Sequence, residues 1–174
     1  IADKFLKNKY EMILTSSSDN ALNKLKEKYG NNHHYYILDF NNPDENNTIL
    51  KKISDEHQDL NIIVNNAGIT DDSLLLRMKT DQWNKVIQAN LSSNFTIIKA
   101  LLPNMIKNKS GKIIGISSVV ATSGNPGQSN YVAAKSGMIG FYKSIALEVA
   151  SRNVNVNIVS PGFVISPMTD KLND

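Results

Sequence analysis

Tyr131 and Lys135 are four residues apart in the stretch "GQSNYVAAKSG", and only Val132, Ala133 and Ala134 separate them. On a helix, residues at i and i+4 lie on one face, so the phenol and the ammonium can point at one spot. A free phenol has a pKa of about 10. A nearby ammonium favours the phenolate, which lowers this pKa toward the range useful for proton transfer. The same spacing also occurs on solvated helix faces, so the pair alone does not identify a site.

Two hydroxyl groups precede this pair at the end of an apolar run. Ser117 and Ser118 close the stretch "GKIIGISS". One of these hydroxyls and the Tyr131 hydroxyl can hold a carbonyl oxygen between them. Side chains cannot carry a hydride, so this proton chemistry suggests carbonyl reduction with a nicotinamide cofactor.

The elements that must position these groups alternate along the chain. Five short apolar runs of the kind found in doubly buried strands are separated by helical stretches. This alternation predicts a doubly wound, Rossmann-like α/β fold, with a parallel sheet and helices on both faces, in a single domain over residues 1–174. Polar turn residues follow every run, and ligands bind beyond the carboxyl ends of such strands. The runs are "YEMILT", "YYILDF", "LNIIVNNAG", "GKIIGISS" and "VNVNIVSPG".

Both ends of the sequence fall inside helical patterns, "IADKFLKNKYEMIL" at the start and "MTDKLND" at the end. We therefore expect a longer native chain. A first strand with its glycine-rich turn is expected before residue 1, and further helices and a last strand are expected after residue 174.

Composition narrows the function classes. The hydrophobic fraction is 41%, the charged fraction is 20% and the net charge is +3, as in an ordinary soluble protein. With no cysteine, disulfides and thiolate catalysis are excluded. Two arginines give little support to nucleic-acid binding, and no apolar run is long enough to span a bilayer. Adjacent His33 and His34 face opposite sides of a strand, so no metal site is expected.

Several motifs together resemble the classical short-chain dehydrogenases/reductases. They are "NNAG" at 65–68, Asn90, "SS" at 117–118, "YVAAK" at 131–135 and "PGF" at 161–163. Three longer stretches, "NNAGITDDSLLLRMK", "GNPGQSNYVAAKSGMIGF" and "PGFVISPMTDKL", are similar to the branch of 3-oxoacyl-[acyl-carrier-protein] reductases of type II fatty-acid synthesis. The resemblance implies an enzyme that reduces 3-oxoacyl groups with NADPH. An enoyl reductase is disfavoured because that branch typically separates its Tyr and Lys by six residues.

The resemblance also implies a role for each catalytic residue. Tyr131 would be the acid/base, and Lys135 would lower its pKa and bind the nicotinamide ribose. Ser118 would orient the substrate carbonyl, with Ser117 as the alternative. Asn90 would anchor a water that links Lys135 to solvent as a proton relay.

For the cofactor NADP(H), the resemblance implies contacts from Tyr131 and Lys135 and from four other parts of the chain. Asp39 and Phe40 would contact adenine, and the backbone N–H of Val164 would bind the nicotinamide carboxamide. Uncharged Ser16 and Ser17 suit the 2′-phosphate of NADPH, whereas an acidic residue would favour NAD; nearby Asp19 is interpreted as a helix N-cap. The turn against the adenosine ribose would be formed by Asn66, Ala67 and Gly68.

The implied partner is an acyl carrier protein that bears the 3-oxoacyl group, and the implied assembly is a homotetramer. Lys109 and Arg152 follow helices and are expected beside the pocket mouth, where the family docks its acidic carrier. The expected compartment is the cytoplasm, with a plastid as the alternative. Two other functions stay open: an acetoacetyl-CoA or other small-carbonyl reductase of the same family, and a non-catalytic dinucleotide-binding or regulatory protein.

Overall fold

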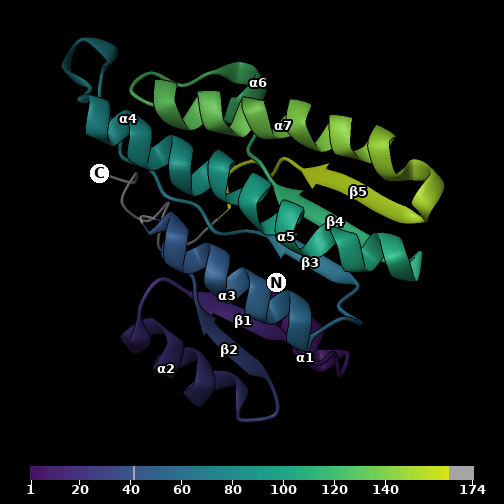
Figure 1. Cartoon of the computed structure of the whole chain (residues 1–174). Coiled ribbons are helices and arrows are strands. Elements are labelled where there is room, and N and C mark those ends of the chain that lie inside the picture. Colours follow the sequence, from purple (N-terminus) through teal and green to yellow (C-terminus); the bar gives the residue numbers. More distant parts are fainter. Residues whose placement is uncertain (41, 165–174) are drawn as a thin grey trace. The chain divides into compact units, whose positions relative to one another are not determined.

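The computed structural model of the chain describes residues 1–40 and 42–164 (Figure 1). The chain divides into two compact units, Ile1–Glu56 (unit 1) and His57–Asp174 (unit 2). The single domain expected over residues 1–174 stays a prediction. Val164, predicted to contact the cofactor, is the last residue of the described part.

Unit 1 contains two parallel strands joined by a helix. The register of the pair runs from Ile13 opposite His34 to Ser16 opposite Ile37. The N-cap of the intervening helix is Ser18, whose hydroxyl accepts from the Ala21 N–H at 3.4 Å. Asp19 is instead the first helical residue, which corrects the interpretation of Asp19 as the cap. The elements are α1 (Ala2–Lys7), β1 (Ile13–Ser16), α2 (Asp19–Tyr29), β2 (His34–Ile37) and α3 (Pro43–Glu56).

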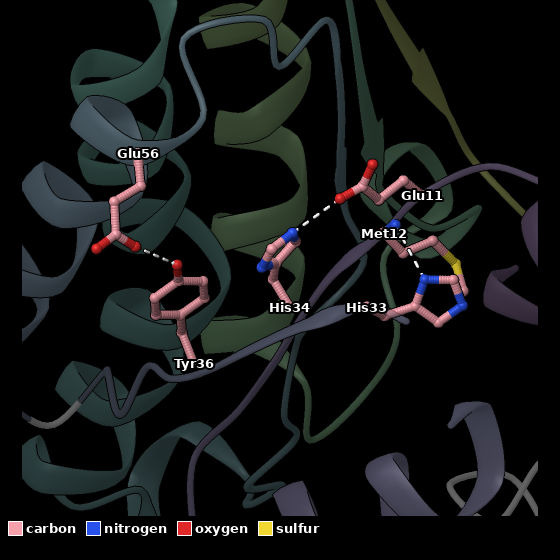
Figure 2. Close-up of polar contacts among 6 residues, drawn as sticks. All are labelled: Glu11, Met12, His33, His34, Tyr36 and Glu56. Carbon is pink, nitrogen blue, oxygen red and sulfur yellow. Dashed lines mark hydrogen bonds and ion pairs between the residues drawn. The ribbon is translucent and has the colours of Figure 1, made fainter. Parts of the chain in front are cut away.

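The adjacent histidines at the start of β2 have separate partners (Figure 2). His34 Nε2 lies 2.8 Å from Glu11 Oε1, and His33 Nδ1 accepts from the Met12 N–H at 3.3 Å. Both contacts tie β2 to the residues just before β1. The two side chains therefore serve the pairing of the strands. No cluster of three or more potential metal-binding side chains occurs among residues 1–40 and 42–164.

Unit 2 is a three-stranded parallel sheet in the order β3-β4-β5. Its register runs from Ile62 opposite Lys112 and from Gly111 opposite Val154. All five predicted strands are thus present, and every strand pair is parallel. The elements of unit 2 are β3 (Ile62–Asn65), η1 (Leu75–Arg77), α4 (Thr80–Ile87), η2 (Gln88–Ser92), α5 (Ser93–Asn108), β4 (Gly111–Ile116), α6 (Val120–Ser123), α7 (Ser129–Val149), η3 (Ala150–Arg152) and β5 (Val154–Val159).

The core of unit 2 forms where α4, α5 and α7 bury their apolar faces (Figure 1). Ile113 of β4, Val86 of α4 and Met105 of α5 have no exposed surface, and Met138 of α7 is 1% exposed. Burying such side chains is the main favourable contribution to folding. This packing fixes α7 with respect to the strands, and α7 carries both Tyr131 and Lys135.

Residues 80–108 form one helical run that contains a π-turn. This π-turn, η2, lies between α4 and α5, and the Ser93 N–H bonds to the Gln88 carbonyl five residues back. π-turns of this kind are often found at functional sites. Asn90 lies in the middle of η2. Within the described part of the chain, no helix has the length and apolar character needed to cross a membrane.

Candidate active site

Four predicted catalytic residues of unit 2 come together beyond the carboxyl ends of β3 and β4. Lys135 Nζ donates to the Ile116 carbonyl at 2.7 Å and lies 5.5 Å from the centroid of the Tyr131 ring. The Ser118 hydroxyl is near enough to the Tyr131 phenol to lower the pKa of that phenol. A Cβ built on Gly68 would overlap Asn90 Oδ1 and lie 3.6 Å from Lys135 Nζ. Three segments far apart in sequence therefore converge on one spot.

The electrostatics of Tyr131 differ from the expectation that Lys135 lowers its pKa. Burial raises the pKa of Tyr131 above its ordinary value, because the phenolate is poorly solvated there. The nearby Ser118 hydroxyl lowers the pKa, and the Asp72 carboxylate raises it again. Desolvation is the largest of these effects, so Tyr131 is a protonated phenol at neutral pH.

Lys135 is buried inside the site, with only 4% of its surface exposed. Burial lowers the pKa of Lys135 to about 8, because the ammonium loses solvation. Its hydrogen bond to the Ile116 carbonyl holds the Nζ at the end of β4. The amine can therefore gain or lose a proton close to neutral pH.

The two serines after β4 have different surroundings. Buried Ser117 donates from its Oγ to the backbone carbonyl of Lys135 at 2.9 Å, so its hydroxyl fastens α7 to the strand. Half-buried Ser118 faces Tyr131, and its Oγ also accepts from the Val120 N–H at 3.4 Å. Of the two, Ser118 is the one placed to share a ligand oxygen with Tyr131.

Asn90 is fully buried in the π-turn, and its amide is only half satisfied. Its Nδ2 donates to the Val86 carbonyl at 2.8 Å and to the Ile69 carbonyl at 2.9 Å. Its Oδ1 is the single buried side-chain polar atom without a hydrogen-bond partner among the described residues. An unsatisfied buried oxygen costs free energy unless water or a ligand reaches it.

Hydrogen bonds from side-chain amides, which the sequence did not predict, stabilise the loop before Tyr131. Gln128 Nε2 donates to Asp72 Oδ2 at 2.8 Å, and Gln82 Nε2 donates to Asp71 Oδ1 at 2.6 Å. Asn130 Nδ2 donates to the Asp71 carbonyl at 3.0 Å. These amides join the segment after "NNAG" to the segment before "YVAAK". Their spacing in sequence gives no signal of the contacts.

The residues predicted to bind the cofactor lie at the ends of strands in both units. In unit 1, Ser16 ends β1, Ser17 follows it, and Asp39 and Phe40 come directly after Leu38, which follows β2. In unit 2, Asn66 and Ala67 are exposed and Gly68 is half-buried after β3, whereas Val164 is exposed after β5.

The two cations predicted to contact a carrier protein, Lys109 and Arg152, lie at the amino ends of the strands of unit 2. Lys109 is two residues before β4 and Arg152 is two residues before β5, whereas Ser118 follows β4. A six-residue strand is about 20 Å long, so neither cation lies beside Tyr131. This corrects the expected position at the pocket mouth. Asn153 Nδ2 donates to the Lys109 carbonyl at 2.8 Å, so the two cations lie on one exposed surface.

Comparison with known proteins places this geometry in a family. The family model described as short chain dehydrogenase matches residues 1–174. The chain belongs to the short chain dehydrogenase family. This membership confirms the resemblance drawn from the motifs and shows that the protein belongs to a family of oxidoreductases.

Curated members of this family align with the whole chain. The 3-oxoacyl-[acyl-carrier-protein] reductases FabG of Salmonella typhimurium and of Escherichia coli K12 are each 45% identical to it over 174 residues, which are 100% of this chain and 71% of each relative. FabG of Buchnera aphidicola is 43% identical over 99% of this chain and 71% of its own length.

A solved member of the family has the same fold. The structure of ElxO with NADP bound superposes with a TM-score of 0.89 at 33% identity, covering 98% of this chain and 70% of ElxO. A tyrosine-to-phenylalanine variant of ElxO with NADPH bound also has a TM-score of 0.89, at 32% identity. The predicted Rossmann-like fold class is confirmed.

Proposed function

We propose that this protein is an NADPH-dependent 3-oxoacyl-[acyl-carrier-protein] reductase, which converts the 3-oxo group to a 3-hydroxy group. The observation that carries this proposal is the convergence of Tyr131, Ser118 and Lys135 in a chain 45% identical over its full length to reductases of that name. Family membership alone would leave the substrate open, because one fold supports many functions.

Reduction needs a proton donor at the carbonyl oxygen, and Tyr131 is that donor. Because burial raises its pKa, the phenol is protonated at neutral pH and ready to give its proton. The alkoxide that develops on the substrate is far more basic than a phenolate, so transfer is downhill even from this weak acid. The Ser118 hydroxyl holds the same oxygen in place and stabilises its developing charge.

After each turnover Tyr131 must recover its proton. Lys135, with a pKa of about 8, lies beside the Tyr131 ring and carries a transferable proton at neutral pH. The unpaired Asn90 Oδ1 adjoins the space beside Gly68 that Lys135 Nζ also borders. A water held at this oxygen would pass protons onward to Lys135, which is the role proposed for Asn90.

The residues present fit a nicotinamide dinucleotide. A Cβ at Gly68 would overlap Asn90 Oδ1, so only glycine fits in this turn, beside an Asn90 oxygen that has no hydrogen-bond partner and close to Lys135. When bound, the cofactor supplies the hydride. We assign the contacts to its ribose and adenine to Lys135, Asn66, Ala67, Gly68, Asp39 and Phe40, the contact to its carboxamide to Val164, and those to its 2′-phosphate to Ser16 and Ser17.

The substrate carrier proposed here is an acyl carrier protein in the cytoplasm, and the proposed assembly is a homotetramer.

The deciding experiment compares acetoacetyl-acyl carrier protein with acetoacetyl-CoA, each with NADPH and with NADH. We expect the highest kcat/KM for the carrier-linked substrate with NADPH. A preference for the CoA thioester would instead identify the acetoacetyl-CoA reductase alternative. Binding of NADPH without turnover of any carbonyl compound would favour the non-catalytic alternative.

A further inference from the structure

A series of buried hydrogen bonds connects Asn65, Tyr142 and Asn94 to the backbone of Asn90. Asn65 Nδ2 donates to Tyr142 Oη at 2.8 Å, and Tyr142 Oη donates to Asn94 Oδ1 at 2.6 Å. Asn94 Nδ2 then donates to the Asn90 backbone carbonyl at 2.9 Å. The exposed fractions are 8% for Asn65, 1% for Tyr142, 2% for Asn94 and 0% for Asn90. We call these four residues the buried relay.

The buried relay joins the three segments that carry the site. Asn65 is the last residue of β3 and directly precedes the turn at 66–68. Tyr142 lies on α7, two helical turns after Lys135 and therefore on the same side of that helix. Asn94 is in the first turn of α5, one turn after Asn90. Tyr142 therefore bonds through its hydroxyl to both β3 and α5.

The π-turn explains why Asn90 needs such a support. In a π-turn the backbone hydrogen bonds run from i to i+5, so the regular pattern of the helix is interrupted. The Asn94 side chain gives the Asn90 carbonyl a donor at this interruption. Fixing this carbonyl also fixes the Asn90 side chain, whose Oδ1 borders Gly68 and Lys135.

The space for the phenol is provided by β4. A Cβ on Gly115 would lie 2.5 Å from Tyr142 Cζ, so only glycine leaves room for the ring there. Burial raises the pKa of Tyr142 to about 12, so its hydroxyl stays protonated at physiological pH and both donates and accepts. The neighbouring Phe141 ring packs edge-on against the Tyr142 ring, with 5.8 Å between the two ring centroids. The hydroxyl, and not the ring, connects the buried relay.

We infer that Tyr142 and Asn94 are positioning residues, which set the place of Asn90 in the active site by linking its π-turn to the "NNAG" turn after β3. Neither residue needs to touch a substrate or cofactor. For its kinetic consequence this inference rests on the proposed reductase function.

The test is Tyr142→Phe, which keeps the ring but leaves the Asn65 donor and the Asn94 acceptor without their partner. We expect kcat to fall by about tenfold, as a small misplacement of a catalytic group can cause, while KM for NADPH changes by less than about twofold. Amide hydrogen exchange should speed up in residues 86–94 by about tenfold. Ile145→Val, which removes one buried methyl group from the same helix, is the control for lost stability and should change neither quantity.

Hydrogen exchange keeps this test separate from the test of the proposed function. If the wild type reduces no 3-oxoacyl substrate, the proposed function fails, and exchange at residues 86–94 alone decides the positioning role. Unchanged exchange in that segment, or a kcat that matches the Ile145→Val control, would overturn the inference even if Tyr142→Phe melts at a lower temperature.

Discussion

Lys135 Nζ lies 5.5 Å from the centroid of the Tyr131 ring while it donates at 2.7 Å to the Ile116 carbonyl. The ammonium is thus fixed by the end of β4 as well as by its place on α7. This bond explains how a flexible side chain is held in one position beside the phenol. It also explains why Lys135 is buried, which lowers its pKa to about 8.

The adjacent serines should separate catalysis from stability. Ser118→Ala removes the hydroxyl that faces Tyr131 and should lower kcat by about 10²-fold. Ser117→Ala leaves the Lys135 carbonyl without its 2.9 Å donor, and should lower the free energy of unfolding by about 1–2 kcal/mol with kcat nearly unchanged. Steady-state kinetics and urea unfolding of both variants check this. The assignment fails if Ser117→Ala is the variant that loses turnover.

Two glycines in unit 2 should respond in opposite ways to alanine. Gly68→Ala places a Cβ against Asn90 Oδ1 and should destabilise the protein by about 1–3 kcal/mol and abolish NADPH binding. Gly140→Ala on α7 meets no atom within 4 Å, so it should stabilise by about 0.5–1 kcal/mol. Thermal unfolding and fluorescence titration with NADPH measure both effects. Normal NADPH affinity in Gly68→Ala would show that the space beside Asn90 is not used by the cofactor.

Replacing Lys135 should show how much its buried ammonium lowers the free energy of unfolding. Between about pH 8 and 10.5 the unfolded Lys135 binds a proton that the folded one does not, so this group makes the wild type more stable as pH rises. Below pH 8 the buried charge is fully present and destabilising. Lys135→Met should therefore be more stable than the wild type at pH 7, by on the order of 2 kcal/mol, and this advantage should shrink toward pH 10. Urea unfolding at the two pH values measures it, and a Lys135→Met that is less stable at pH 7 would contradict the account.

The Asp72 carboxylate should raise the pKa of Tyr131. Because Asp72 disfavours the phenolate, Asp72→Asn should lower the pKa of Tyr131 and move the alkaline limb of the tyrosine titration to lower pH. The asparagine can still accept from Gln128, so the loop keeps its contact. The titration is followed by tyrosinate absorbance, with each protein compared with its own Tyr131→Phe derivative. Asp81→Asn is the control, and an equal shift in it would remove the special role of Asp72.

Much of this fold can be predicted from the spacing of the apolar residues along the sequence. The five strands and the long helices follow apolar patterns that persist for a whole element, and their order determines which ends meet. The motif residues Ser118, Tyr131 and Lys135 then come together because two of them share one helix face and the third follows the end of the neighbouring strand. Short elements such as α6 and η1 escape prediction because three or four residues carry no period.

Other features depend on contacts that periodicity does not encode. The π-turn at Asn90 leaves the apolar pattern on both sides almost unchanged, and the only trace of it is the pair Asn90 and Asn94 in an apolar helix. Tyr142 has the pattern of a core aromatic residue, and its hydrogen bonds become visible only in three dimensions. The spacing of Lys135 shows that it is close to Tyr131 but does not show the desolvation of the phenol, which raises the pKa of Tyr131.

The central claim, that Tyr131 gives the proton in a carbonyl reduction, is tested most directly by one kinetic comparison. NADPH oxidation with acetoacetyl-acyl carrier protein is measured for the wild type, for Tyr131→Phe and for Tyr29→Phe, a half-buried control from unit 1 whose hydroxyl bonds to Asp3. We predict that Tyr131→Phe lowers kcat by about 10²–10⁴-fold while NADPH binding and the Tyr29→Phe control stay near wild-type values. Turnover retained in Tyr131→Phe would contradict the proposed mechanism.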